Sequence, residues 1–110
     1  MPEEEYTVTV RRDAETGIVV SEYWQMDGSD HREGAPSLII RDGLTGMVLQ
    51  EGWFHNGKLH RDDGPAEILR KAETGHVYYS AWYKDGVKIK PPTSAKRPTA
   101  SPRLPAPKPR

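Results

Sequence analysis

Residues 51–69, EGWFHNGKLHRDDGPAEIL, form the clearest copy of a unit that recurs every 29 residues along the chain. One period earlier the sequence reads EYWQMDGSDHREGAPSLII, and one period later it reads SAWYKDGVKIKPP, with no gap in either alignment. Repetition at a fixed period predicts copies that stack on one another, because a single copy is too small to bury its own apolar side chains. The matching positions include Trp24, Trp53 and Trp82, and Gly28, Gly57 and Gly86.

Each copy predicts a long β-hairpin followed by a short return strand. In the first copy, β-forming residues at 6–12 and 18–26 flank a turn that contains Gly17. Asp27-Gly28 then forms a two-residue turn, because Asp or Asn followed by Gly tolerates the two positive φ angles that such a turn requires. The sequence therefore predicts an all-β protein, an elongated antiparallel meander. Its remaining strands are expected at 29–32, 37–41, 47–55, 58–61, 66–71, 76–84 and 87–90.

The repeated apolar columns predict which side chains form the core. One column contains Val19, Val48 and Val77, and it lies five residues before the tryptophan column, so a regular strand would point the two columns to opposite faces. Either a β-bulge brings the tryptophans to the core face, or both faces are partly covered. We favour a bulge near Ser21-Glu22, Gln50-Glu51 and Tyr79-Ser80. The other expected core residues are Val8, Val10, Ser37, Ile39, Ala66 and Ile68.

Composition divides the 110 residues into a repeat domain at 6–90, with units near 7–35, 36–64 and 65–90, and a tail at 91–110. The tail contains seven of the ten prolines and no aromatic residue, so we expect an extended, disordered, basic segment. Cysteine is absent, which excludes disulfides and thiolate metal sites. The acidic start and the lack of a long apolar run argue against a signal peptide or a membrane span, and we expect a soluble cytoplasmic protein.

The pattern W-x-x-[ND]-G-x-x-H-R-x-x-G-P-A resembles the variant MORN-type repeat of bacterial and phage proteins. The resemblance covers about residues 18–90, and the second copy matches it best, from Trp53 to Ala66. The first copy has Gly34 one place early, and the third replaces His-Arg by Ile89-Lys90. What the resemblance implies is a β-hairpin scaffold for protein contacts, with no catalytic residues.

His31-Arg32 and His60-Arg61 recur at equivalent positions and are candidate partner-binding residues. In a structural role, each histidine would pack beside the preceding tryptophan, and each arginine would pair with an acid such as Glu33, Asp62 or Asp63. In a binding role, the arginines would present donors to a carboxylate or phosphate. Metal binding through His55, His60 and His76 is not expected, because these histidines lack close ligand spacing. We predict no metal, no cofactor and no catalytic residue.

The aromatic residues exceed what a narrow core can hide if both faces of the strands carry them. Most are expected in the core, whereas an exposed stripe at Phe54, Tyr79 and Tyr83 would form a protein-binding surface. We therefore expect a non-enzymatic adaptor, inhibitor or structural component with an acidic, aromatic-bearing sheet. The sheet edges at 6–12 and 87–90 are open to a partner strand or to a second copy of the chain.

Charge separates along the chain and suggests a second class of function. Residues 1–86 contain sixteen acids and nine Lys/Arg, whereas residues 87–110 contain seven Lys/Arg and no acid. A basic tail attracts nucleic acid in a salt-dependent way, although it can also be a solvated linker. In a third reading, the acidic body mimics nucleic acid and inhibits a nucleic-acid-binding enzyme, as small phage inhibitors do. The candidate nucleic-acid-binding residues are Lys96, Arg97, Arg103, Lys108 and Arg110.

Overall fold

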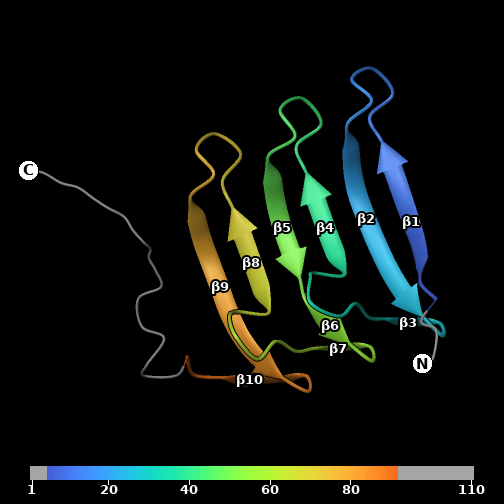
Figure 1. The fold of residues 1–110 in the computed structure, drawn as a ribbon. Helices are drawn as coiled ribbons and strands as arrows, with labels where there is room; N and C mark the ends of the chain where they lie inside the picture. The colour runs from blue at the N-terminus through green and yellow to red at the C-terminus, as the bar shows by residue number, and fades with distance from the viewer. Residues whose placement is uncertain (1–4, 92–110) are drawn as a thin grey trace, which may run out of the picture.

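The computed structural model describes residues 5–91, which form an antiparallel β-meander without helices. Figure 1 shows three long hairpins side by side, joined at one end by short segments that carry the return strands. The all-β fold predicted from the repeat is thus confirmed. The tail prediction for residues 91–110, with its five candidate nucleic-acid-binding residues, lies outside the described residues apart from Pro91.

The main sheet follows the order β1-β2-β4-β5-β8-β9-β10, with β3 beside β2, and β6 and β7 form a separate two-stranded sheet. Consecutive hairpins pair edge to edge through β2–β4 and β5–β8. The strands are β1 (Thr7–Arg12), β2 (Val19–Met26), β3 (Ser29–Asp30), β4 (Leu38–Arg41), β5 (Val48–Gly52), β6 (Phe54–His55), β7 (Lys58–Leu59), β8 (Glu67–Arg70), β9 (Val77–Lys84) and β10 (Val87–Ile89).

The Asp-Gly and Asn-Gly turns adopt the conformation that the sequence predicts. Asn56 and Gly57 have φ angles of 52° and 83°, and the turns at Asp27 and Asp85 repeat this pair. Both central residues of a type I′ turn require positive φ, which Asn and Asp tolerate better than other residues with a side chain. The strand predicted at 47–55 is interrupted at Trp53, where the chain leaves the main sheet and enters β6.

A β-bulge occurs at the same position in every hairpin. Arg11 lies opposite Ser21 but Arg12 lies opposite Val19, so Val20 is the extra residue. Leu49 and Tyr78 are the corresponding extra residues in the second and third hairpins. The predicted bulge is therefore present, about one residue before its expected position. It places the valine and tryptophan columns on the same face, because the extra residue reverses the alternation once.

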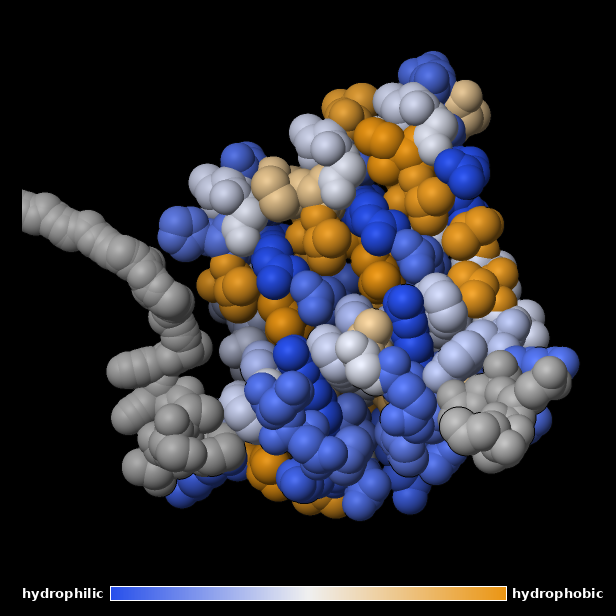
Figure 2. Space-filling view, in the orientation of Figure 1, coloured by the Kyte–Doolittle hydropathy of each residue, from blue (hydrophilic) through white to orange (hydrophobic). Residues whose placement is uncertain are grey.

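The strand register separates the side chains of the two faces, since residues directly opposite each other share a face. We call one the tryptophan face; its central row is Val10, Glu22, Ile39, Glu51, Ile68 and Ser80, and alternation along the strands adds the tryptophan column. Figure 2 shows one face of the molecule, on which apolar groups are interleaved with strongly hydrophilic groups over the hairpins. We call the other the tyrosine face; its rows contain Ser21, Ile40, Gln50, Leu69 and Tyr79, and Tyr23, Leu38, Gly52, Glu67 and Ala81.

Few side chains are fully buried, because the main sheet is one layer thick. Among the expected core residues, Ile39 and Ile68 are each 8% exposed and Ala66 is completely buried. The prediction is wrong for Val8, Val10 and Val77, which are 39%, 47% and 48% exposed. These three valines lie in β1 and β9, whereas Ile39 and Ile68 lie in strands that have neighbours on both sides.

Candidate functional site

The corner that follows each return strand is held by an arginine stacked on a tryptophan. The guanidinium carbon of Arg32 lies 3.6 Å from the ring centre of Trp24, and that of Arg61 lies 3.7 Å from the ring centre of Trp53. Each arginine also donates a hydrogen bond to the carbonyl four residues later, at 3.2 Å for Arg32 and 3.1 Å for Arg61. Cation–π contact and carbonyl binding together fix the conformation of the corner. Arginine, and not histidine as expected, therefore packs on the tryptophan ring.

The histidine of each corner bonds to the next copy of the repeat. Nδ1 of His31 accepts a hydrogen bond of 3.0 Å from the backbone N–H of Asn56, and Nδ1 of His60 accepts one of 3.0 Å from that of Asp85. A neutral imidazole has one protonated nitrogen, so the proton of each ring resides on Nε2. Nε2 faces Glu33 at 3.1 Å in the first corner and Asp62 at 3.3 Å in the second. Each histidine thus connects a carboxylate of its own corner to the turn of the following copy.

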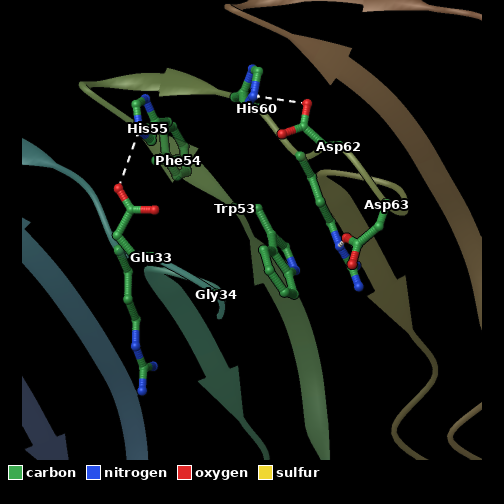
Figure 3. A pocket seen from close by; sticks show the side chains of 10 residues that line it. Glu33, Gly34, Trp53, Phe54, His55, His60, Asp62 and Asp63 are labelled. Carbon is green, nitrogen blue, oxygen red and sulfur yellow. Dashed lines mark hydrogen bonds and ion pairs between the residues drawn. The ribbon is translucent and has the colours of Figure 1, made fainter.

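A cleft of about 340 Å³ lies between the two corners, where β6 and β7 cross from one to the other. Figure 3 shows Glu33 directed at His55 on one side of the cleft, and Asp62 directed at His60 on the other. Trp53 lies between these two pairs. The cleft is lined by Arg32, Glu33, Gly34, Trp53, Phe54, His55, His60, Arg61, Asp62 and Asp63.

The carboxylates of this cleft all have cationic or hydrogen-bonding partners within the protein. Asp63 accepts a hydrogen bond of 3.0 Å from Arg61, and Asp62 lies 3.0 Å from the ammonium of Lys84. The hydrogen bond and charge of Lys84 hold the pKa of Asp62 below its ordinary value, with a smaller contribution from His60. The acid pairing expected for the corner arginine thus holds for Arg61, whose partner is Asp63.

His31, Glu33 and His55 have ligand atoms within 4.8 Å of one another, which raises the question of a metal ion. A metal-binding histidine normally donates its second ring nitrogen to an acceptor, which leaves the first nitrogen free for the ion. His31 has the opposite arrangement, because its Nδ1 faces the N–H of Asn56 and its Nε2 carries the proton. The cluster is therefore explained by two imidazoles around one carboxylate. His76, which the sequence analysis considered as a metal ligand together with His55 and His60, lies just before β9. Its carbonyl accepts a hydrogen bond from the backbone N–H of Lys71 in the turn between β8 and β9.

Ion pairs on the tryptophan face connect each hairpin to the next. Glu22 lies 2.8 Å from Arg41, and Glu51 lies 2.6 Å from Arg70. Burial raises the pKa of Glu22, but hydrogen bonds from the Trp24 indole and from Arg41 outweigh it and leave the pKa below its ordinary value. These pairs are half-buried and geometrically equivalent, so they belong to the repeat.

The three expected aromatic binding residues lie on the tyrosine face. Along β9, Tyr79 and Tyr83 lie on the face opposite to Ser80 and Trp82. The Tyr79 side chain is 37% exposed, and that of Tyr83 is half-buried. Phe54 packs over Gly52, where an added Cβ would lie 2.9 Å from the phenylalanine ring. Tyr23 was not predicted as a binding residue, but it is 42% exposed on this same face. Its position could have been predicted from the sequence, because Tyr23 lies one residue before Trp24 and therefore points to the opposite face of the strand.

Comparison with known proteins gave no match to a protein-family model, to a curated protein or to a solved structure. Residues 5–91 contain no helix that is long and apolar enough to cross a membrane.

Proposed function

We propose that this chain is a non-enzymatic protein-interaction module that binds a protein partner through its tyrosine face. The observation that carries the proposal is the difference between the two faces. On the tryptophan face, arginines and glutamates pair with one another between hairpins. In the two central rows of the tyrosine face Glu67 is the one charged residue between β2 and β9, and Tyr23 and Tyr79 of these rows are 42% and 37% exposed.

The composition of this face suits protein recognition. Tyrosine and phenylalanine offer large contact areas with little side-chain entropy to lose, and they are enriched in protein–protein interfaces. Tyr23 and Tyr79 are exposed at positions separated by the second hairpin, so a partner can contact both across the leucines of β4 and β8. The corner residues His31, Arg32, His60 and Arg61 support the scaffold in this proposal, because their polar groups are engaged within the chain.

The test compares two substitutions in β2 that alter opposite faces. Tyr23→Ser removes an aromatic ring from the tyrosine face, and Val19→Ser removes an apolar group from the tryptophan face. Immobilised wild-type protein would be used to isolate partners from cells of its native host, and their binding to each variant would then be measured by calorimetry. We expect Tyr23→Ser to weaken binding at least tenfold and Val19→Ser to preserve it. Equal affinity for wild type and Tyr23→Ser would contradict the proposal.

Charge supports nucleic-acid association as a second candidate function. Residues 5–91 contain fourteen acids and eleven Lys/Arg, whereas residues 92–110 contain five Lys/Arg and no acid. Binding through these five cations would weaken steeply with salt, because each phosphate contact releases a counterion. Fluorescence polarisation with a labelled single-stranded oligonucleotide, on the full chain and on a chain ending at residue 91, tests this candidate. Nucleic-acid mimicry ranks lower, because Glu22 and Glu51 are paired with arginines.

A further inference from the structure

The exposed apolar side chains concentrate at the two ends of the sheet. Val10 in β1 is 47% exposed, whereas Ile39 and Ile68, which occupy the same column in β4 and β8, are each 8% exposed. Strands β4 and β8 each have a neighbouring strand on both sides, whereas β1 is the first strand of the sheet and has a neighbour only on the β2 side. At the other end, Val77 and Tyr78 of β9 are 48% and 60% exposed. Both ends therefore resemble an internal junction from which one hairpin is missing.

The backbone of β1 faces outward in the way that an internal junction requires. The Trp24 and Trp53 amides donate to the carbonyls of Ser37 and Ala66, which shows that these carbonyls point to the preceding hairpin. Residues two apart in a strand share this direction. By the same 29-residue spacing, the carbonyl of Val8 and the backbone groups of Val10 point away from β2 into the space beside β1.

The opposite end of the sheet offers a free edge of matching length. Strand β10 pairs with β9 from Trp82 to Lys84 only. The stretch from Val77 to Ala81 is paired on its inner side with β8, and within residues 5–91 it has no strand on its outer side. The C-terminal end of the sheet thus has two open parts: β10, as the sequence suggested, and the stretch of β9 from Val77 to Ala81 that β10 does not cover.

We propose that copies of this chain associate head to tail, with β1 of one copy on the outer edge of β9 of the next. The register follows from the internal junctions, in which Gln50, Glu51 and Gly52 lie opposite Leu69, Ile68 and Glu67. Advancing this register by one period places Tyr79, Ser80 and Ala81 opposite Arg11, Val10 and Thr9 of the second copy. The two surfaces differ, so the contact is heterologous and extends into an open array instead of closing as a symmetric dimer.

One difference from the internal junctions sets the strength of the association. Glu22 pairs with Arg41 and Glu51 with Arg70, but the third position of the glutamate column is Ser80. Arg12, the equivalent of these arginines, donates instead to the carbonyl of Gly17 at 3.0 Å. The contact between copies thus lacks an ion pair that both internal junctions have, and we expect association that is reversible and weak.

This difference provides a gain-of-function test by sedimentation velocity of the full chain over a range of concentrations. Ser80→Glu restores the missing acid within reach of Arg12, two residues beyond its opposite residue Val10, and should raise the association constant about two- to fivefold, the range of a partly exposed ion pair. Adding Arg12→Ser should cancel the gain. Val10→Pro should abolish association but leave the monomer folded, because an edge strand tolerates proline where its N–H faces solvent.

Disulfide trapping tests the register directly, because the chain has no cysteine of its own. Arg11→Cys and Tyr79→Cys, made in separate chains and mixed under mild oxidation, should form a mixed disulfide, since the two positions are directly opposite in the proposed pairing. Arg12→Cys mixed with Tyr79→Cys is the matched control, because these positions lie on opposite faces. Wild-type and Ser80→Glu proteins that both stay monomeric at millimolar concentration would overturn the proposal, and so would equal cross-linking in the control mixture.

Discussion

Replacing His31 by alanine should cost far more stability than replacing His55, although the two rings are neighbours with centres 4.5 Å apart. His31 is 5% exposed and accepts the backbone N–H of Asn56 at 3.0 Å, whereas the His55 side chain is 40% exposed. Removing the acceptor of this part-buried hydrogen bond costs about 1–3 kcal/mol. Losing the ring contacts with His55 and Tyr6 adds about 1 kcal/mol.

The expected loss for His31→Ala is therefore about 2–4 kcal/mol in the free energy of unfolding. In a domain of this size each kcal/mol shifts the melting temperature by about 4–8 °C, so the decrease should be about 10 °C or more. His55→Ala should cost less than about 1 kcal/mol, as partly exposed positions usually do. Urea unfolding followed by tryptophan fluorescence measures both variants. Equal losses for the two would refute the inference that His31 joins successive copies.

The same inference predicts which nitrogen of the neutral ring carries the proton. Nδ1 of His31 and of His60 accepts a backbone N–H, so both rings should be the Nε2–H tautomer. Long-range proton–nitrogen NMR spectra distinguish the two tautomers by the nitrogen shifts. An Nδ1–H tautomer at either ring would contradict the hydrogen bond to the following copy.

Three further predictions follow from single contacts. Arg61→Lys should cost about 1 kcal/mol in the free energy of unfolding, because lysine has no planar fork to stack on Trp53 and reach the Pro65 carbonyl; an unchanged urea midpoint would contradict this. Backbone N–H groups of the turns hold the pKa of Asp13 and of Asp42 below the ordinary value of a carboxyl group. Both carboxylates therefore stabilise the fold above the unfolded-chain pKa, and this stabilisation is lost as the pH falls through the lower folded pKa. Replacing both by Asn should flatten the decline in melting temperature between about pH 5 and pH 2, and an equally steep decline would contradict it. Gly52→Ala should displace the Phe54 ring, visible as shifted aromatic NMR signals, because the new methyl group would lie 2.9 Å from it.

The repeat made most of the fold predictable from the sequence. Nine of the ten strands match expected segments, and the tenth arises because the chain leaves the main sheet at Trp53 within a single expected strand. Turn chemistry fixed the hairpins, since Asp or Asn before Gly tolerates the positive φ angles found at Asp27, Asn56 and Asp85. The exposure of Val10 and Val77 could not be predicted from the recurrence of apolar residues at their positions. It depends on whether a column has neighbours on both sides, and the end strands do not.

The sequence singled out the corner residues as a recurring pair but did not specify their contacts. The recurrence of His-Arg left a structural and a binding role open, and the expectation that the histidine meets the tryptophan was wrong. The acceptor role of His31 was out of reach, because its donor is the backbone of Asn56, 25 residues away in the next copy. Such a contact follows from how copies stack, which a period alone does not specify.

Comparison between copies shows how the two faces divide their roles. The interactions that join the hairpins lie at the corners and on the tryptophan face, where the stacked arginines and the Glu–Arg pairs repeat with nearly the same geometry. The Trp and Val columns are identical in all three copies, whereas the stacked arginine and the paired glutamate are replaced only in the third copy, which has no following hairpin within residues 5–91. Within residues 5–91 no ion pair between copies lies on the tyrosine face, so its residues are free to differ from copy to copy. Its columns vary accordingly, as Ser21, Gln50 and Tyr79, as Tyr23, Gly52 and Ala81, and as Gln25, Phe54 and Tyr83.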